Sequence, residues 1–554
     1  IAVMSGGEEN KQSTRKRDFS STSGQSNHQQ QRQRKKNKPN NHWKSRNQQD
    51  AERKNKLDGD DGDDGPRDQW NQRGAPHPGS YAVAEIVNST DYQTRHISQA
   101  NPVKKKFVLC ISYLGTNYQG LQINPDAHTI EKELERALLY NGSLIAENFG
   151  YFSKIQYTRA ARTDRGVHAL TQSCAMRLIV PREVDNNDES ARTAFLTQLN
   201  TFLPPDIQVN GIIKVSKNFN AHAKCTKRIY HYLLPTYLLQ SKEFLLPILQ
   251  NLYRQQGPIK GAGYDGGYVD PNSLKSLSTE NLKTIYTTIE NAYRISNEDI
   301  SKFRSILKLF EGTRSYHNYT TGKDATEANA KRYMLSCTCE DPFINTTTGI
   351  EFIKIVFYGQ SFLLNQIRKM VGMAIEVMHG SMSLDQMTYS FHANCKMDIP
   401  MIPALGLYLA DIFFDGYNNK QRILTNKDQQ IKEARENAGS EEKQEGEETK
   451  EGEENVNLQE VEKVGEEVEG GGGDEEEGED KDEGKTGGPV DQTEMEREEI
   501  YWYDNPNTKE RIVNFQDNIL YPHLFQQEKD SLAFLYYLDY LRACPHSYPI
   551  PPPN

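Results

Sequence analysis

Residues 159–169 read Arg159-Ala160-Ala161-Arg162-Thr163-Asp164-Arg165-Gly166-Val167-His168-Ala169, with one carboxylate among arginines and directly before a glycine. Nearby positive charge favours the ionised form of a carboxyl group, so Asp164 should stay charged. Gly166 permits a sharp or left-handed turn, and the run 172–180 behind it is typical of a strand. A carboxylate on such a turn can act as a nucleophile. It can equally form a structural ion pair, and the local residues leave both interpretations open.

Strand and helix patterns alternate on both sides of this turn. Apolar runs at 107–113 and 352–358 predict strands, and 219–234 predicts a further strand region. Helical spacing predicts helices from Thr129 past Leu138, over 191–203 and over 362–378, with another helical face at 303–310. These units predict an α+β fold with two related α/β-sandwich modules of the ferredoxin or RRM type. The modules would form one extended antiparallel or mixed sheet with a central cleft.

Composition and pattern divide the chain into six parts. In order, these are a disordered basic and polar tail (1–105), an N-terminal module with Asp164 and Tyr230 (106–237), an irregular insert (238–282), a C-terminal module with Arg368 (283–423), a disordered acidic linker (424–499), and a C-terminal segment that docks on the core through an aromatic-rich helix (500–554).

The net charge of -11 is the sum of a strongly acidic segment and a basic remainder of the chain. Residues 441–500 alone carry a formal charge of -20, and the remaining chain carries +9. Most of the basic excess lies in the first 106 residues, which carry +7. The acidic balance therefore does not argue against an anionic partner, although binding by the folded part would need a patterned site.

Cysteine usage and hydropathy exclude several classes of protein. The seven cysteines form no CxxC pair, and Cys337 and Cys339 lack a second ligand pair, so no metal site is expected and the thiols fit a reducing compartment. Mean hydropathy is -0.80, and no apolar run is long enough to span a membrane. We find no apolar signal-peptide core. Because the chain begins at Ile1, we expect the true start to lie upstream.

Four blocks, in order over roughly 105–416, together resemble the TruA family of tRNA pseudouridine synthases. They are Tyr113–Gly120 with the helix start at Thr129, Ala161–Ala169, Phe219–Tyr232, and Gly359–Gly372 with Pro403–Leu407 behind it. Within that family the chain looks most like the eukaryotic Pus1-type enzymes, through the blocks 310–320, 415–418 and 512–523. Arg314 and Asn365 depart from the family pattern, each standing where His is common. These departures would affect RNA contacts rather than the catalytic groups.

The resemblance implies an isomerase that converts selected uridines of tRNA to pseudouridine, with snRNA or mRNA as further substrates and no cofactor. It implies that Asp164 attacks the ribose at C1′ or assists a glycal route, and the sequence does not choose between them. Arg368 matches the family's active-site arginine, which would orient the carboxylate and keep it charged. Tyr230 matches the active-site tyrosine, on which a flipped-out uracil would stack and which could move a proton.

RNA contacts are expected around these three residues. The phosphate ligands would be Arg162, Arg165, Lys227, Arg228 and Lys369, with His317 and Asn318 as further RNA contacts. His168 and His317 are expected to be structural rather than catalytic.

The resemblance leaves alternatives beside the enzyme. A noncatalytic RNA-binding or RNA-folding protein on the same scaffold should have lost Asp164, Tyr230 or Arg368, yet all three are present. An Asp-nucleophile hydrolase would need a second carboxylate near Asp164, and the blocks show none.

The remaining expectations concern partners and location. The resemblance favours a monomer. Basic clusters at 15–17 and 32–38 predict nuclear import or a nonspecific RNA-binding tail, and a mitochondrial pool stays open. The acidic linker is either an insert without a specific role or an electrostatic mimic of RNA.

Overall fold

The strand that follows Gly166 is the longest in this computed structural model, β3 (His168–Pro181). It pairs antiparallel with β1 (Pro102–Tyr113), whose other edge pairs with β4 (Ile207–Lys214). From Phe107 onward every residue of β1 is buried, because the strand has covered faces on both sides. The Asp164 turn therefore leads directly into the rigid centre of the N-terminal half.

The structure describes residues 86–88, 102–241, 244, 247–248, 274, 277–444, 498–543 and 548–551. All of them belong to one compact unit, 58–554. Nearly all of the tail predicted at 1–105, most of the insert predicted at 238–282 and residues 445–497 of the acidic linker lie outside the described residues.

A second group of strands continues the same sheet. β5 (Lys227–Pro235) lies between β10 (Leu407–Phe413) and β9 (Glu351–Gly359), antiparallel to both. β7 (Lys331–Cys339) and β6 (Gly312–Ser315) follow outward. The two short strands are β2 (Thr158–Arg159), which pairs with β3, and β8 (Phe343–Ile344), which pairs with β9.

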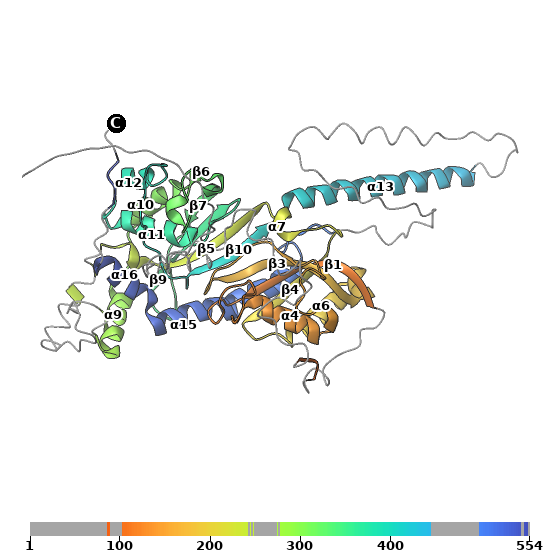
Figure 1. Ribbon diagram of the computed structural model, residues 1–554, viewed down its shortest axis with the longest axis horizontal. Helices are drawn as coiled ribbons and strands as arrows, with labels where there is room; N and C mark the ends of the chain where they lie inside the picture. The colour runs from red at the N-terminus through yellow and green to blue at the C-terminus, as the bar shows by residue number, and fades with distance from the viewer. Residues whose placement is uncertain are drawn as a thin grey trace, which may run out of the picture. The chain divides into compact units, whose positions relative to one another are not determined.

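The join between the two halves is a parallel pairing. Tyr408 and Leu409 of β10 pair with His168 and Ala169 at the start of β3. The order β4-β1-β3-β10-β5-β9-β7-β6 thus makes a single mixed sheet of ten strands within the described residues. The predicted α+β class and the one extended mixed sheet are confirmed (Figure 1).

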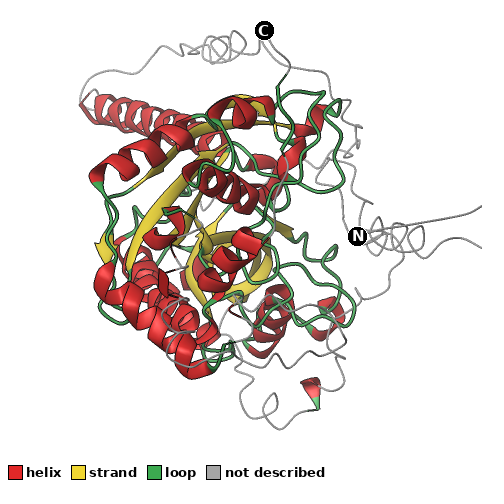
Figure 2. Cartoon of the chain, turned by 90° about the vertical axis from the view of Figure 1, so that its left-hand side faces the viewer, coloured by secondary structure: helices red, strands yellow, loops and turns green. Residues whose placement is uncertain are grey.

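Helices flank the strands in both halves (Figure 2). In the N-terminal half these are α4 (Ile130–Tyr140), α5 (Arg182–Asp185), α6 (Glu189–Asn200) and α7 (Ala221–Lys224). In the C-terminal half they are α9 (Thr279–Ala292), α10 (Asn297–Lys308), α11 (Gln366–Met378) and α12 (Leu384–Tyr389). Single 3-10 turns lie at Ala146–Asn148, Thr236–Leu239, His317–Tyr319 and Ala328–Ala330.

Local chemistry moves three predicted boundaries. The helix predicted over 191–203 begins at Glu189, because the Asp188 side chain caps it by accepting from the backbone N–H of Ala191. The strand region predicted over 219–234 starts only at Lys227, since Asn220 caps the short helix α7. The helix predicted over 362–378 starts at Gln366, because Asn365 has a left-handed backbone with φ of 60°.

Helix α13 (Asp415–Gln444) runs well into the 424–499 range for which the composition predicts disorder. Its sequence is rich in Lys, Gln, Glu, Ala and Arg, which are good helix formers. Glutamate-rich composition alone therefore does not separate a solvated helix from an unstructured linker.

The C-terminal segment packs along the sheet in both halves. It contains α14 (Pro506–Phe515), a π-helical turn (Gln516–Leu520), α15 (Tyr521–Ser531) and α16 (Ala533–Ala543). The indole N–H of Trp502 donates to Ser173 Oγ of β3 at 2.9 Å. On the other half, the hydroxyl of Tyr237 donates to the buried carboxyl of Glu528 at 3.3 Å. No helix among the described residues has the length and apolar character needed to cross a membrane.

Candidate functional site

The turn that carries Asp164 has a defined geometry. The N–H of Val167 donates to the carbonyl of Asp164 at 3.1 Å, and Gly166 has φ of +79°. A positive φ at the third residue is what a type II turn requires, and glycine adopts it without steric cost. Asp164 is half-buried, with Arg162 and Arg165 exposed around it. The Asp164 carboxylate is therefore presented on a turn of defined geometry.

A second loop packs on the back of this turn. The N–H of Leu121 donates to the carbonyl of Thr163 at 3.2 Å. Gly120 has φ of +92°, and a Cβ there would lie 3.0 Å from that same carbonyl oxygen. Only glycine fits this approach. This explains in physical terms why the 113–120 block accompanies the Asp164 turn.

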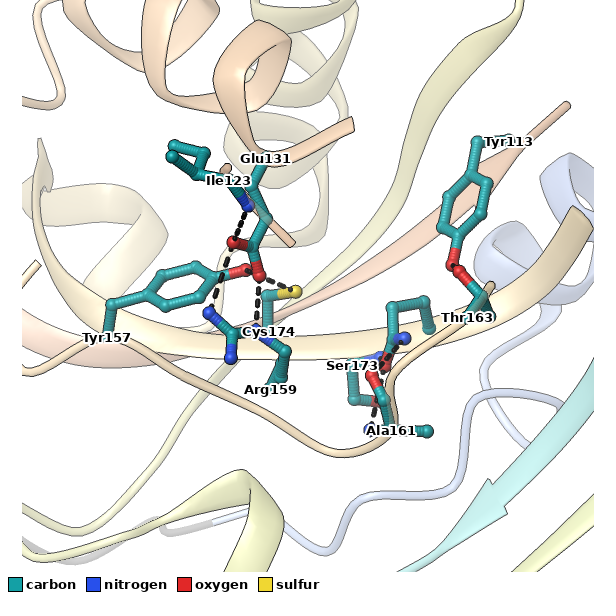
Figure 3. Close-up of polar contacts among 10 residues, drawn as sticks. Tyr113, Ile123, Glu131, Tyr157, Arg159, Ala161, Thr163, Ser173 and Cys174 are labelled. Atoms are coloured by element: carbon teal, nitrogen blue, oxygen red, sulfur yellow. Dashed lines mark hydrogen bonds and ion pairs between the residues drawn. The ribbon is translucent and has the colours of Figure 1, made fainter. Parts of the chain in front are cut away.

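β3 holds the chain that leads into the turn (Figure 3). The side-chain amide of Gln172 donates to the carbonyl of Ala161 at 2.7 Å and accepts from its N–H at 3.3 Å. The N–H of Ala160 donates to the carbonyl of Ser173 at 2.9 Å. Gln172 is completely buried, so its amide is fixed. Two consecutive residues before the turn are thus clamped to the central strand.

The hydroxyl of Tyr113, at the end of β1, lies 2.7 Å from the hydroxyl of Thr163 (Figure 3). Both side chains are buried. Burial raises the pKa of the Tyr113 phenol well above its usual range, so Tyr113 stays a neutral donor or acceptor. This contact fixes the residue directly before Asp164.

A buried ion pair supports the same segment from α4. Glu131 accepts hydrogen bonds from the guanidinium of Arg159, the hydroxyl of Tyr157 and the backbone N–H of Ile123 (Figure 3). Burial opposes the charged form of Arg159, yet the neighbouring Glu131 carboxylate raises its pKa above the usual range. Glu131 is thus held in a buried ion pair with Arg159.

Arg368 lies in the first turn of α11 and reaches Asp164 electrostatically. Its Nε donates to the carbonyl of Ile402 at 2.8 Å, and its Nη1 donates to Asn365 Oδ1 at 3.3 Å. Burial lowers the pKa of the Arg368 guanidinium, and electrostatic interactions with Tyr232 and with the Asp164 carboxylate oppose that shift. The structure therefore brings Arg368 and Asp164, from opposite halves of the sheet, within electrostatic range.

Tyr230 lies on β5, which pairs with β10 next to the join between the two halves. Its side chain is 7% exposed, and its ring packs edge-on against Phe362 with centroids 4.9 Å apart. It also acts electrostatically on Tyr113, which places the two phenols near each other. Tyr230 is thus near Tyr113, whose hydroxyl contacts Thr163, the residue directly before Asp164.

The predicted phosphate ligands lie in different surroundings. Lys227 pairs with Asp415 at 3.0 Å, which raises the pKa of the lysine. Lys369 is held near the carbonyls of Asn318 and Thr320 at 3.4 and 3.5 Å, and burial lowers its pKa. Among these cations, the arginines of the Asp164 turn are the exposed ones.

His317 and Asn318 are buried and hold a neighbouring loop. The Nε2 of His317 lies 2.8 Å from the carbonyl of Cys395, and Asn318 donates to Ser390 and accepts from the N–H of Met397. That they contact RNA stays a prediction. His168 is completely buried and accepts from the N–H of Gly115; burial lowers its pKa to about 3. Neutral His168 is thus a structural acceptor.

Sequence reasoning missed the supports of the site: Tyr113, Glu131, Arg159 and Gln172. A buried polar side chain inside a strand pattern, such as Gln172 in the run 172–180, was the available signal. In the described part of the chain we find no cluster of three or more His, Cys, Asp or Glu side chains arranged to hold a metal ion. A cavity of about 550 Å³ lies between β4, α6 and residues 498–511. Asp164, Tyr230 and Arg368 do not line it.

The chain is similar in sequence to known tRNA pseudouridine synthases. A family model described as tRNA pseudouridine synthase matches residues 306–415. The chain is 33% identical over 350 residues to tRNA pseudouridine synthase 1 of Kluyveromyces lactis, covering 57% of this chain and 61% of that protein. It is 30% identical over 411 residues to tRNA pseudouridine synthase 1 of Eremothecium gossypii, covering 65% of this chain and 75% of that protein.

A human relative agrees with these two. Pseudouridylate synthase 1 homolog of Homo sapiens is 30% identical over 317 residues, covering 56% of this chain and 61% of that protein. The chain spans about three fifths of the length of the Kluyveromyces and human proteins.

Proposed function

Since the chain belongs to the TruA family of tRNA pseudouridine synthases, we propose that it isomerises specific uridines of tRNA to pseudouridine. One observation carries this proposal. Arg368 acts electrostatically on Asp164, although α11 and the Asp164 turn lie in opposite halves of the sheet. A positive charge near a carboxylate favours its ionised form, which is the form that a nucleophile or base requires.

The reaction has a simple balance of bonds and protons. The N1–C1′ bond of uridine breaks and a C1′–C5 bond forms, while C5 loses its proton and N1 gains one. No oxidant, reductant or phosphoryl donor is consumed. The reaction therefore needs one protein group that acts on the ribose and one route by which the C5 proton leaves.

Asp164 is the group we assign to the ribose. Its carboxylate either attacks C1′ and holds the sugar covalently, or accepts the C2′ proton to form a glycal. Both routes need the same placement, on a turn whose preceding residues are held by Gln172 and Tyr113. Such clamping costs nothing at the moment of reaction because it is made on folding.

Tyr230 and Arg368 complete the assignment. A uracil turned out of the RNA would stack on the Tyr230 ring, and the phenol would relay the C5 proton. Arg368 would hold the Asp164 carboxylate while its Nε stays on the carbonyl of Ile402.

The partner we propose is tRNA, with snRNA or mRNA as further substrates. The exposed Arg162 and Arg165 would contact phosphates and fix the register of the RNA. We further propose two ferredoxin-like modules with the RNA cleft between them, joined where β10 pairs with β3. A monomer, and nuclear import through the basic clusters of the tail, complete the proposal.

The test is tritium release from tRNA labelled at C5 of uridine, because isomerisation expels that hydrogen. We expect release with the wild-type chain and at least a 1000-fold lower rate with Asp164→Ala, at tRNA affinity within threefold. The matched control is Asp341→Asn, an exposed aspartate paired with Arg304, which should leave the rate unchanged. Wild-type rates from Asp164→Ala would overturn the proposal, and tRNA binding without release by wild type would favour a noncatalytic protein.

A further inference from the structure

The guanidinium of Arg228 bonds two carbonyl groups that lie far apart in the sequence. Its Nη2 donates to the carbonyl of Ala160 at 2.7 Å, and its Nη1 donates to the carbonyl of Gln360 at 2.7 Å. Arg228 itself lies near the start of β5, between β9 and β10. One side chain thus touches a segment of each half of the sheet.

These two carbonyls belong to the segments that carry the site. Ala160 precedes the Asp164 turn, and its own N–H is already fixed on Ser173 of β3 at 2.9 Å. Gln360 directly follows the end of β9 and leads towards Asn365, the N-cap of α11, which carries Arg368. A contact that joins Ala160 to Gln360 therefore sets the distance between the supports of Asp164 and of Arg368.

The contact has the geometry of an arginine fork. A guanidinium presents several N–H donors in one rigid plane, so a single side chain can bond two acceptors at a fixed spacing. A lysine ammonium is a flexible point donor without that geometry. Ala160 is fully buried whereas Gln360 is exposed, so the bond to Ala160 is the one that water replaces less readily.

We infer that Arg228 is a positioning residue that holds the Asp164 segment against the Arg368 segment, rather than a phosphate ligand. This inference rests on the proposed function, since it concerns the alignment of the groups assigned to the reaction. Its neighbour Lys227 differs, because that cation is engaged with Asp415 instead of bridging the halves.

The two roles respond differently to Arg228→Lys. A phosphate ligand works mainly by charge, so the lysine variant should keep both the rate and the salt dependence of tRNA binding. A positioning arginine works by its fork, so we expect the single-turnover rate at saturating tRNA to fall about 10–100-fold. The tRNA affinity should stay within twofold, and the slope of log affinity against log salt should not change.

Arg228→Ala supplies a second readout that a general loss of stability would not produce. Millimolar guanidinium ion should restore part of its rate, because the free ion can occupy the site between the two carbonyls. The matched control is Arg304→Lys, since Arg304 also donates to a backbone carbonyl, that of Cys339, but on the periphery of the sheet. That control should keep the wild-type rate.

Each outcome has a distinct meaning. If the wild-type chain releases no tritium, the proposed function fails and the inference falls with it. If wild type is active and Arg228→Lys reacts at the wild-type rate, the positioning role is overturned while the proposed function stands. A lower salt slope in Arg228→Ala, with no rescue by guanidinium, would return Arg228 to the phosphate ligands.

Discussion

Both carboxylate oxygens of Glu131 accept hydrogen bonds from the guanidinium of Arg159, and the Glu131 side chain is completely buried. This pair lies under the segment that leads to Asp164, and Tyr157 satisfies the carboxylate further. A buried pair of this kind adds little net stability when intact, because desolvation offsets the attraction. Removing one partner is costly, since it leaves the other charge buried without compensation.

Glu131→Gln should therefore destabilise the fold by about 3–5 kcal/mol. The free energy of unfolding from urea titration measures this change. Glu340→Gln is the control, because Glu340 pairs with Lys354 at the surface and its loss should cost below about 1 kcal/mol. Equal losses in the two variants would contradict the buried-pair account.

Tyr113→Phe removes the hydroxyl that contacts Thr163, directly before Asp164. We expect a loss of about 1–2 kcal/mol in stability and a fall in the rate of tritium release, because the Thr163 hydroxyl loses its partner. Tyr408→Phe is matched to it: that buried hydroxyl contacts Tyr521 and His231. It should cost similar stability without slowing the reaction, and a slowed Tyr408→Phe would weaken the link to Thr163.

The buried carboxyl group of Asp411 should make the free energy of unfolding depend on pH. Burial raises the pKa of this carboxyl to about 7, with Asp504 adding to the shift and hydrogen bonds from Ile412 and Thr171 opposing it. Between about pH 4 and pH 7 the folded state keeps a proton that the unfolded state loses, so stability falls as pH rises through that window. Asp411→Asn should remove this fall, which amounts to about 2–4 kcal/mol. Unfolding free energies of wild type and variant at pH 4.5 and pH 8 test it, and a constant difference between them would refute the shift.

Asn365 makes two separable contributions, its left-handed backbone and its bond to Arg368. Asn365→Gly allows the left-handed backbone without strain but removes the hydrogen bond to Arg368. We therefore expect near-native stability and a slower reaction. Asn365→Ala loses the bond and also places an ordinary residue at positive φ, which should cost about 1 kcal/mol in addition. Melting temperatures beside tritium-release rates separate the two effects, and equal melting temperatures for both variants would exclude backbone strain.

Local residues left Asp164 open between a nucleophile and a structural ion pair, and the family resemblance pointed to it as the reactive group, but neither pointed to the residues that hold it. The charge around Asp164 and the turn at Gly166 are readable from neighbouring residues, and the family blocks pointed to Arg368 and Tyr230. The position of Glu131 in the first turn of α4 does not reveal its partner, because helical spacing says nothing about contacts with another segment. Its contact with Arg159 depends on how α4 packs against the sheet.

The same limit applies to Arg228. Its charge and its neighbour Lys227 suggested a phosphate contact, and no local pattern reveals that its donors face Ala160 and Gln360. Thr129 shows a smaller version of this limit. It stands at the N-cap of α4 as its residue type predicts, yet its side chain makes no capping hydrogen bond.

The place of β10 bears on how the molecule is made. β1, β3 and β4 are synthesised early and pair with one another, but β10 must be inserted between β3 and β5 from much later in the chain. Pairings between distant segments are the slow step in folding, because the loop between them must close first. A nascent chain that has not yet reached residue 413 thus holds the Asp164 turn and Tyr230 without the strand that joins their halves. The site that we propose can therefore be completed only after residues 407–413 have been synthesised.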